Sequence, residues 1–251
     1  MLRCRKFGVL GAIAGLGLMT SNAHAVVTLD NFLGFMDAVA SGPPAGLKTD
    51  FDSLVTGNAL GGERDLIVTR NSANSGTVTA DTDGSEAGAF SFGSGNATTG
   101  MAELQYDGGD ANAAFNATGL GGISLISSGE LGLVGEVASD LGAVFTLQIY
   151  TDAGNWSQAM VAIPATGSST TYVPFFIPFA SLAGGAGALN LANVGAVKLI
   201  LDGTNFPSAD VGLRLLEFKV PPPTVPEPGS VALLIGMGTV GMGMIARRRK
   251  N

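Results

Sequence analysis

The segment Gly229–Ala246 contains no charged residue and is followed at once by Arg247-Arg248-Arg249-Lys250. As a helix with a rise of about 1.5 Å per residue it is roughly 27 Å long, which matches the hydrocarbon core of a bilayer. Lys and Arg beside such a span stay cytoplasmic, because moving them through lipid is costly. The sequence therefore predicts a transmembrane helix at 229–246, a basic cytoplasmic tail at 247–251, and export of everything before the helix.

The tetrapeptide Val225-Pro226-Glu227-Pro228 stands directly before this segment. Proline fixes φ and lacks a backbone donor, so the tetrapeptide is expected to stay extended where a peptidase can grip it. The order of motif, apolar helix and basic stop resembles the PEP-CTERM sorting domain of Gram-negative bacteria, also catalogued as the ice-binding protein C-terminal domain. The resemblance implies cleavage by an exosortase, a membrane transpeptidase. A plain single-pass anchor is the alternative, but it leaves the prolines unexplained.

The N-terminus has the parts of a secretory signal peptide. Basic residues at 3–6 precede an apolar run at 7–19, and Ala23-His24-Ala25 places small residues at the positions that signal peptidase reads. The apolar run is too short to span a bilayer comfortably. We therefore expect residues 1–25 to be removed and the mature chain to begin at Val26.

Removal of this peptide also removes the single cysteine, Cys4, and the single histidine, His24. A Ser-His-Asp or Cys-His nucleophile, a zinc site of Cys and His ligands, a His-ligated haem and any disulfide are then excluded. Carboxylates, hydroxyls, amides and a few basic residues remain. The sequence accordingly names no catalytic residue and predicts a protein that is not an enzyme.

Residues 26–224 contain nineteen Asp and Glu against six Lys and Arg, a net charge of −13. Nucleic-acid binding needs Lys and Arg to displace counterions from phosphate, so this charge argues against DNA or RNA as a partner.

Apolar residues recur at intervals of three and four between Leu29 and Ala40, with Asp30 as a candidate N-cap, and this pattern predicts a short amphipathic helix. From Leu47 onward the chain changes to short runs of alternating apolar and polar residues separated by glycine, which is typical of antiparallel strands. We expect strands at 48–54, 65–70, 76–80, 87–92, 101–106, 111–117, 123–127, 131–137, 143–150, 155–163, 172–177, 194–201 and 211–218.

Many short strands and almost no helix predict one all-β domain at 26–220, an antiparallel β-sandwich of jelly-roll type. The stretches 49–52, 60–66 and 119–123 resemble surface proteins with a carbohydrate-binding-module-like or galactose-binding-like jelly roll, and the segments from 179 to 218 look like the closing strands of such sandwiches. Residues 221–228 are expected to form a stiff, Pro-rich linker that holds the sandwich off the membrane.

Tyr150 and Trp156 flank a predicted turn, where an exposed aromatic ring could stack on a sugar. Packing across neighbouring strands is the alternative. Asp81 and Asp83, and likewise Asp107 and Asp110, place carboxylates beside glycine in a spacing that can offer oxygens to Ca²⁺. Ordinary Asp-Gly turns are the alternative there.

These observations predict an exported protein of the cell surface or extracellular matrix of a Gram-negative bacterium. Its expected partners are signal peptidase, the inner membrane transiently, exosortase, and an exopolysaccharide such as that of a biofilm. The sandwich is expected to be structural or to bind glycan, with structural calcium as the one candidate cofactor. A secreted hydrolase with two carboxylates is the alternative, but the sequence cannot select the pair. An ice-binding role is disfavoured because the chain shows no regular Thr-x-Thr array.

Overall fold

The computed structural model describes residues 26–42 and 47–221. Strands dominate this part of the chain, with two short 3₁₀ helices, η1 (Leu60–Gly62) and η2 (Phe179–Ser181). The strands are β1 (Val27–Asp30), β2 (Met36–Ala40), β3 (Lys48–Val55), β4 (Glu63–Arg70), β5 (Val78–Thr82), β6 (Ala89–Ser94), β7 (Gly100–Tyr106), β8 (Gly132–Ser139), β9 (Ala143–Asp152), β10 (Asn155–Ile163), β11 (Ser168–Pro178), β12 (Ala183–Ala186), β13 (Ala196–Asp202) and β14 (Asp210–Lys219).

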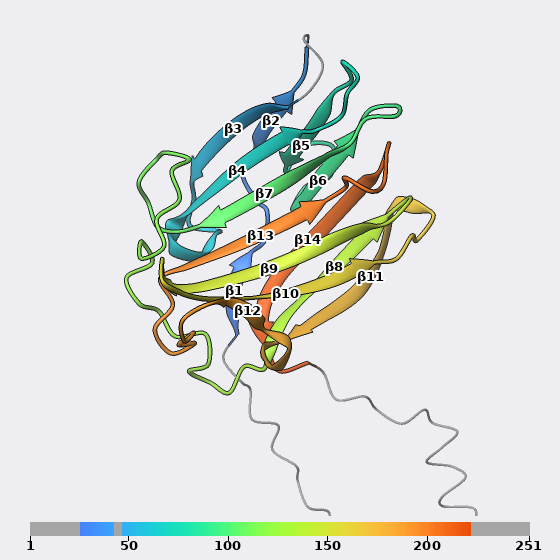
Figure 1. The fold of residues 1–251 in the computed structure, drawn as a ribbon. Helices are drawn as coiled ribbons and strands as arrows, with labels where there is room; N and C mark the ends of the chain where they lie inside the picture. The colour runs from blue at the N-terminus through green and yellow to red at the C-terminus, as the bar shows by residue number, and fades with distance from the viewer. Residues whose placement is uncertain (1–25, 43–46, 222–251) are drawn as a thin grey trace, which may run out of the picture.

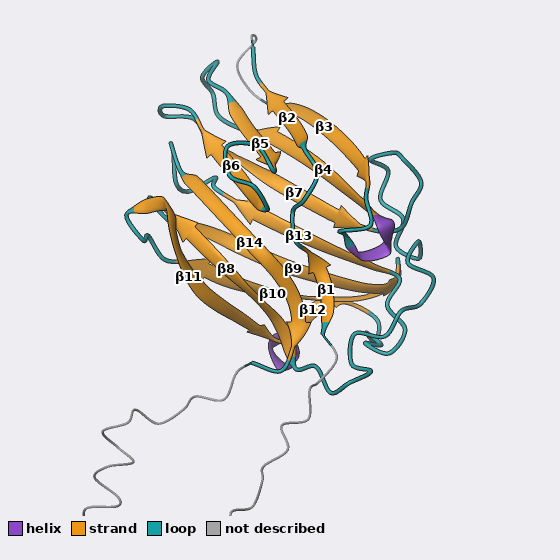
Figure 2. Ribbon diagram, turned by 180° about the vertical axis from the view of Figure 1, so that it is seen from behind, coloured by secondary structure: helices purple, strands orange, loops and turns teal. Residues whose placement is uncertain are grey.

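The strands form two antiparallel sheets packed face to face, so the prediction of an all-β sandwich is confirmed (Figure 1). Sheet A has the order β11-β8-β14-β6-β5-β2, with β1 paired to β14, and it faces the viewer in Figure 2. Sheet B has the order β12-β10-β9-β13-β7-β4-β3. Consecutive strands repeatedly cross from one sheet to the other, so each sheet is built from segments that are far apart in the sequence.

The core lies between the sheets and is built by alternation along each strand. In β9, Phe145, Leu147 and Ile149 are buried, as the sequence predicts, and face Phe90 and Phe92 of sheet A within one cluster. Outward positions carry the polar residues. At roughly 1.5–3 kcal/mol for each fully buried Leu, Ile or Phe side chain, this cluster provides the main driving force for the sandwich.

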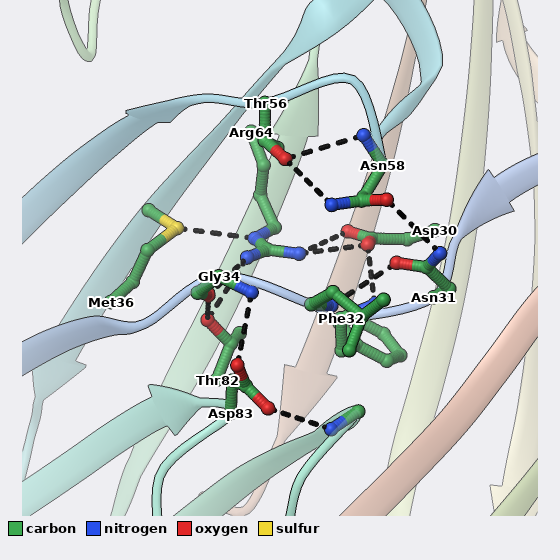
Figure 3. Close-up of polar contacts among 12 residues, drawn as sticks. Asp30, Asn31, Phe32, Gly34, Met36, Thr56, Asn58, Arg64, Thr82 and Asp83 are labelled. Atoms are coloured by element: carbon green, nitrogen blue, oxygen red, sulfur yellow. Dashed lines mark hydrogen bonds and ion pairs between the residues drawn. The ribbon is translucent and has the colours of Figure 1, made fainter.

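A charged pair also lies in this core (Figure 3). Arg64 of β4 donates to both carboxylate oxygens of Asp30 in β1, at 2.7 and 2.8 Å, and to Thr82 Oγ1 of β5 at 2.9 Å. Tyr106 of β7 donates its hydroxyl to Asp30 at 2.8 Å. Because β1 and β5 belong to sheet A and β4 and β7 to sheet B, the network joins the two sheets.

The helix predicted between Leu29 and Ala40 is wrong. The segment forms β1 and β2 on either side of a bend, where Phe32 and Gly34 have φ values of 56° and 95° that no right-handed helix contains. In β2 the burial alternates at every second residue rather than at every third or fourth. Asp30 does not cap a helix but accepts the hydrogen bonds of Arg64.

The strands predicted at 111–117 and 123–127 are also wrong. Residues 107–131 form a long loop, and in it Asn112, Ala114 and Thr118 each donate a backbone N–H to the Asp or Asn side chain two residues earlier. Such local side-chain bonds compete with strand pairing. The remaining predicted strands each overlap an observed one, whereas β12 was not predicted.

The first and last strands pair with each other, Val27 opposite Phe218, so the two ends of the described sandwich leave it side by side. The predicted signal peptide with Ala23 and Ala25, the sorting motif, the transmembrane segment and the basic tail lie outside the described residues. Within 26–42 and 47–221, no helix has the length and apolar content needed to cross a bilayer.

Candidate functional site

A groove of about 520 Å³ crosses the outer face of sheet A. Its floor comes from β5, β6 and β14, and its wall from the start of β11 and the β5–β6 turn. Polar and small side chains line most of it: Thr79, Asp81, Ser85, Glu86, Ser91, Gly93, Ser169, Thr170, Tyr172, Asp210 and Gly212. The sequence singled out Asp81 alone among these residues.

Strand register explains the floor. Asp81 of β5 lies opposite Ser91 of β6, which lies opposite Gly212 of β14, and the next outward row is Thr79, Gly93 and Asp210. Strand residues alternate between faces, so each of these side chains points away from the core. A Cβ at Gly212 would lie 2.6 Å from the Tyr172 hydroxyl, so the absence of a side chain there is what lets the wall approach the floor.

The wall forms where β11 leaves its partner. The pairing of β11 with β8 is irregular between Ser168 and Val173, which frees this segment to fold over β14. The Tyr172 hydroxyl donates to Glu86 at 2.9 Å, Arg214 forms an ion pair with Glu86, and the Arg214 guanidinium lies 4.0 Å from the centre of the Tyr172 ring. These three contacts fix the tyrosine against the groove.

The groove carries two acids without a basic partner. Each ion pair found in the described part of the chain uses an acid other than Asp81 and Asp210. Burial raises the pKa of Asp81, and the neighbouring Asp37 raises it further; burial and Asp140 do the same for Asp210. The groove thus offers acceptor oxygens to a donor-rich ligand.

The groove continues past Asp81. A second hollow of about 390 Å³ shares Asp81 and Ser85 with it and reaches Phe35 and Asp37. Together they extend over most of the width of sheet A, which suits an extended ligand rather than an enclosed one.

Tyr150 and Trp156, the predicted glycan-binding pair, lie on the outer face of sheet B and stack on each other, with ring centroids 5.4 Å apart and an angle of 19°. Phe115 from the 107–131 loop packs against Tyr150 at 4.7 Å. Strand β12 pairs with β10 beside Trp156, and a Cβ at Gly185 would lie 3.0 Å from an indole carbon. The rings pack among these neighbours, and stacking on a sugar stays a prediction.

The four predicted calcium ligands fall into two separate groups. Asp81 and Asp83 lie at the end of β5 in sheet A, and Asp83 accepts the backbone N–H groups of Gly34 and Gly88, which makes it a turn residue. Asp107 and Asp110 follow β7 in sheet B, where they meet Glu63 and Asp65 of β4. The sequence did not indicate this meeting, because Glu63 and Asp65 are more than forty residues away.

The comparisons with known proteins concern the tail and the fold. Residues 224–250 match the family described as the PEP-CTERM protein-sorting motif, so the recognition of this motif is confirmed. The motif indicates an exported protein that passes through a membrane-anchored intermediate. No curated protein matches the chain.

Similar solved structures include the family 11 carbohydrate-binding module from Clostridium thermocellum in complex with a β-1,3-1,4-mixed-linked tetrasaccharide, at 14% identity and a TM-score of 0.39 over 79% of this chain and 97% of that one. A variant of a family 29 carbohydrate-binding module complexed with mannohexaose is 11% identical, with a TM-score of 0.33 over 74% and 92%. An agarase is 7% identical, with a TM-score of 0.38 over 53% and 21%. At these TM-scores the likeness carries no argument about what this chain binds.

Proposed function

We propose that this chain is a cell-surface protein, sorted by exosortase through residues 224–250, whose sandwich binds a neutral extracellular polysaccharide in the sheet A groove. The observation that carries the proposal is the lining of that groove: its floor holds unpaired carboxylates and hydroxyls together with glycine and serine. Sugar hydroxyls are hydrogen-bond donors, and carboxylates are strong acceptors for them. The small floor residues leave room for pyranose rings.

Charge favours a neutral glycan over an acidic one. Asp81 and Asp210 lie beside Asp37 and Asp140, so the groove has a negative field that an anionic polysaccharide would oppose. Glu86 adds little to this field, because Arg214 neutralises it.

The position of the groove suits display at a surface. β14 begins at Asp210 in the groove and ends at Lys219, next to the segment that leads to the sorting motif. Nine residue steps of about 3.4 Å separate these two ends by roughly 30 Å. The groove therefore lies at the end of the sandwich away from the tail.

A glycan array that contains neutral and uronic-acid polysaccharides, followed by calorimetry with the best neutral oligosaccharide, tests the binding half. Asp81→Asn and Asp210→Asn should each weaken binding by roughly tenfold or more, since a hydrogen bond to a charged group contributes about 1.5–3 kcal/mol. Glu103→Gln, on the outer face of sheet B, is the control and should bind normally. Binding that survives both groove substitutions but is lost in Trp156→Ala would move the site to sheet B.

The hydrolase alternative keeps one supporting observation, since the groove does hold more than one carboxylate. We favour binding because Glu86 is engaged by both Arg214 and Tyr172. Incubation with the bound polysaccharide, followed by an assay for new reducing ends, separates the two functions. Binding without new reducing ends supports the binding function, whereas formation of reducing ends that stops in Asp210→Asn supports the hydrolase.

Cell fractionation with and without the exosortase tests the sorting half. We expect a shortened chain at the surface when the exosortase is present and a full-length chain in the inner membrane when it is absent. A full-length inner-membrane chain in both strains would contradict the sorting proposal.

A further inference from the structure

A cluster of acids lies at the edge of sheet B, under the 107–131 loop. Carboxylate oxygens of Glu63, Asp65 and Asp110 lie within 4.8 Å of one another. Glu63 and Asp65 both point outward from β4, and Asp65 lies opposite Gln105 of β7, so Asp107 follows β7 at the level of Glu63. Strand register and the turn back of the loop together bring four acids to one place.

Asp65 is the unusual member of this cluster. Its side chain is fully buried, and neither carboxylate oxygen has a hydrogen-bond partner among the described residues. The adjacent Ser53 donates its hydroxyl to Glu63 at 2.5 Å, so that proton is not available to Asp65. A buried carboxylate without a partner is among the most costly arrangements in a protein interior.

Two neighbouring residues also have a buried oxygen without a hydrogen-bond partner among the described residues. Asp107 is 2% exposed and its Oδ1 has no partner in the described part of the chain, and the same holds for Oε1 of the buried Gln105. Lys198, which lies opposite Gln105, pairs instead with Glu103 at 2.8 Å. The cluster therefore has an excess of buried negative oxygen.

We propose that Glu63, Asp65, Asp107 and Asp110 bind a calcium ion, with Gln105 Oε1 as a candidate neutral ligand. Ca²⁺ takes six to eight oxygens at about 2.3–2.6 Å, so two ligands on opposite sides of one ion lie up to roughly 5 Å apart. The 4.8 Å span of the three mutually close oxygens meets this limit. A donor set made of oxygen alone suits a hard cation, and several carboxylates in an irregular arrangement suit Ca²⁺ better than the strictly octahedral Mg²⁺.

The ion would fasten the long loop to the sheet. Glu63 Oε2 already accepts the backbone N–H groups of Asp110 and Ala111, at 2.5 and 3.0 Å, and Asp107 Oδ2 accepts that of Asn116 at 2.5 Å. The same loop carries Phe115 onto Tyr150, which stacks on Trp156. Calcium at the cluster would therefore order the aromatic group on sheet B, and Trp156, the single tryptophan of the chain, reports on it.

The test uses the full chain in detergent, freed of metal with a chelator and titrated with CaCl₂ alone. We expect a calorimetric binding signal with a Kd on the order of 10⁻⁴ M or tighter, a higher thermal midpoint, and a change in Trp156 fluorescence. MgCl₂ should give a much weaker response. Absence of both a binding signal and a midpoint shift at millimolar Ca²⁺ would overturn the proposal.

Asp65→Asn best distinguishes a calcium ligand from an acid with a purely structural role. It should abolish the calcium-dependent shift and, in chelator, raise the midpoint above that of the unsubstituted chain, because a buried unpaired charge has been removed. A side chain with a purely structural role would lower the midpoint in both conditions, which would count against the site. Asp110→Asn, at an exposed position, is the second variant should Asp65→Asn not fold, and it should weaken calcium affinity by about tenfold or more. Glu130→Gln, whose buried Oε1 also lacks a partner among the described residues, is the matched control and should keep the full calcium response.

Discussion

Arg64 Nη1 donates to both carboxylate oxygens of Asp30, and both side chains of this ion pair are fully buried between the two sheets. Arg64 Nη2 also donates to Thr82 Oγ1 and to the Gly34 carbonyl oxygen, and its Nε–H lies 3.1 Å from Met36 Sδ. Asp30 also accepts the Tyr106 hydroxyl and the Phe32 backbone N–H. Because the partners come from opposite sheets, the pair joins the two sheets. A well-satisfied buried pair is costly to break on one side, which makes it the most sensitive point of the core.

Arg64→Met should lower the free energy of unfolding by about 3–5 kcal/mol, because it leaves Asp30 buried without its partner. Urea unfolding followed by circular dichroism measures this. The double variant Arg64→Met with Asp30→Leu should recover part of the loss, since it removes both charges. Glu217→Gln, in the partly exposed pair with Lys219, is the control and should change stability by less than about 1 kcal/mol. Equal effects of Arg64→Met and the control would refute the role given to the pair.

Gly212→Val should abolish glycan binding while the sandwich stays folded. The added Cβ would meet the Tyr172 hydroxyl at 2.6 Å and the Ser169 carbonyl oxygen at 2.9 Å, so the β11 wall must move off the floor. Calorimetry with the oligosaccharide and a thermal scan give the two readouts. Gly57→Ala, between β3 and η1 where a Cβ would meet nothing within 4 Å and φ is not positive, should leave binding unchanged.

Glycan affinity should fall as the pH is lowered. The fall should begin at a higher pH than it would if the binding carboxylates were ordinary exposed aspartates. The pKa values of Asp81 and Asp210 are raised in the folded protein, chiefly by burial. Protonation removes a carboxylate acceptor, so binding is strongest above both pKa values and weakens as the pH falls through them. For stability the sign is opposite: a raised folded pKa means that protonation of these two groups favours the folded state. Calorimetry between pH 7 and 4, together with titration of the carboxylates by NMR, checks this prediction. A glycan affinity that does not change over that pH range would contradict it.

Gly119→Ala should displace the 107–131 loop. Its Cβ would overlap the Asp107 carbonyl oxygen, and no side-chain rotation can relieve this overlap because that oxygen belongs to the backbone. We expect altered Trp156 fluorescence and faster amide exchange in the loop, with little change in the opposite sheet. Gly121→Ala is the control for adding a Cβ without a steric clash, because that Cβ would meet nothing within 4 Å, although the φ of 70° at Gly121 adds some strain. Unchanged loop exchange in Gly119→Ala would contradict the packing described.

Sorting should depend on the prolines before the apolar segment. Replacing Pro226 and Pro228 with alanine would allow the helix predicted at 229–246 to extend through the motif, which would hide the peptide bond from the peptidase. Immunoblots of membrane fractions should then show the full-length chain accumulating. Normal processing of this variant would show that extended backbone is not what the peptidase requires.

Local sequence pattern was enough to identify the sorting motif of this protein and most of its strands. A bilayer-length apolar run, a prolyl motif and a basic stop are contiguous in the chain, so their meaning does not depend on folding. Alternation such as that of Phe145, Leu147 and Ile149 is likewise local, because a strand shows its two faces in its own residues. The errors at 29–40 and 111–117 came where left-handed residues and Asp or Asn side chains overrode the apolar spacing.

The sites depended on residues that only folding brings together. Tyr172 and Glu86 are far apart in sequence yet share a hydrogen bond, and the groove exists because β11 folds over Gly212. Glu63 and Asp65 meet Asp107 and Asp110 through strand register and a long loop. A single sequence shows which segments alternate between apolar and polar residues and which are long and apolar enough to span a bilayer, because both properties belong to consecutive residues. It does not record which distant oxygens are buried side by side, because that follows from how two sheets pack.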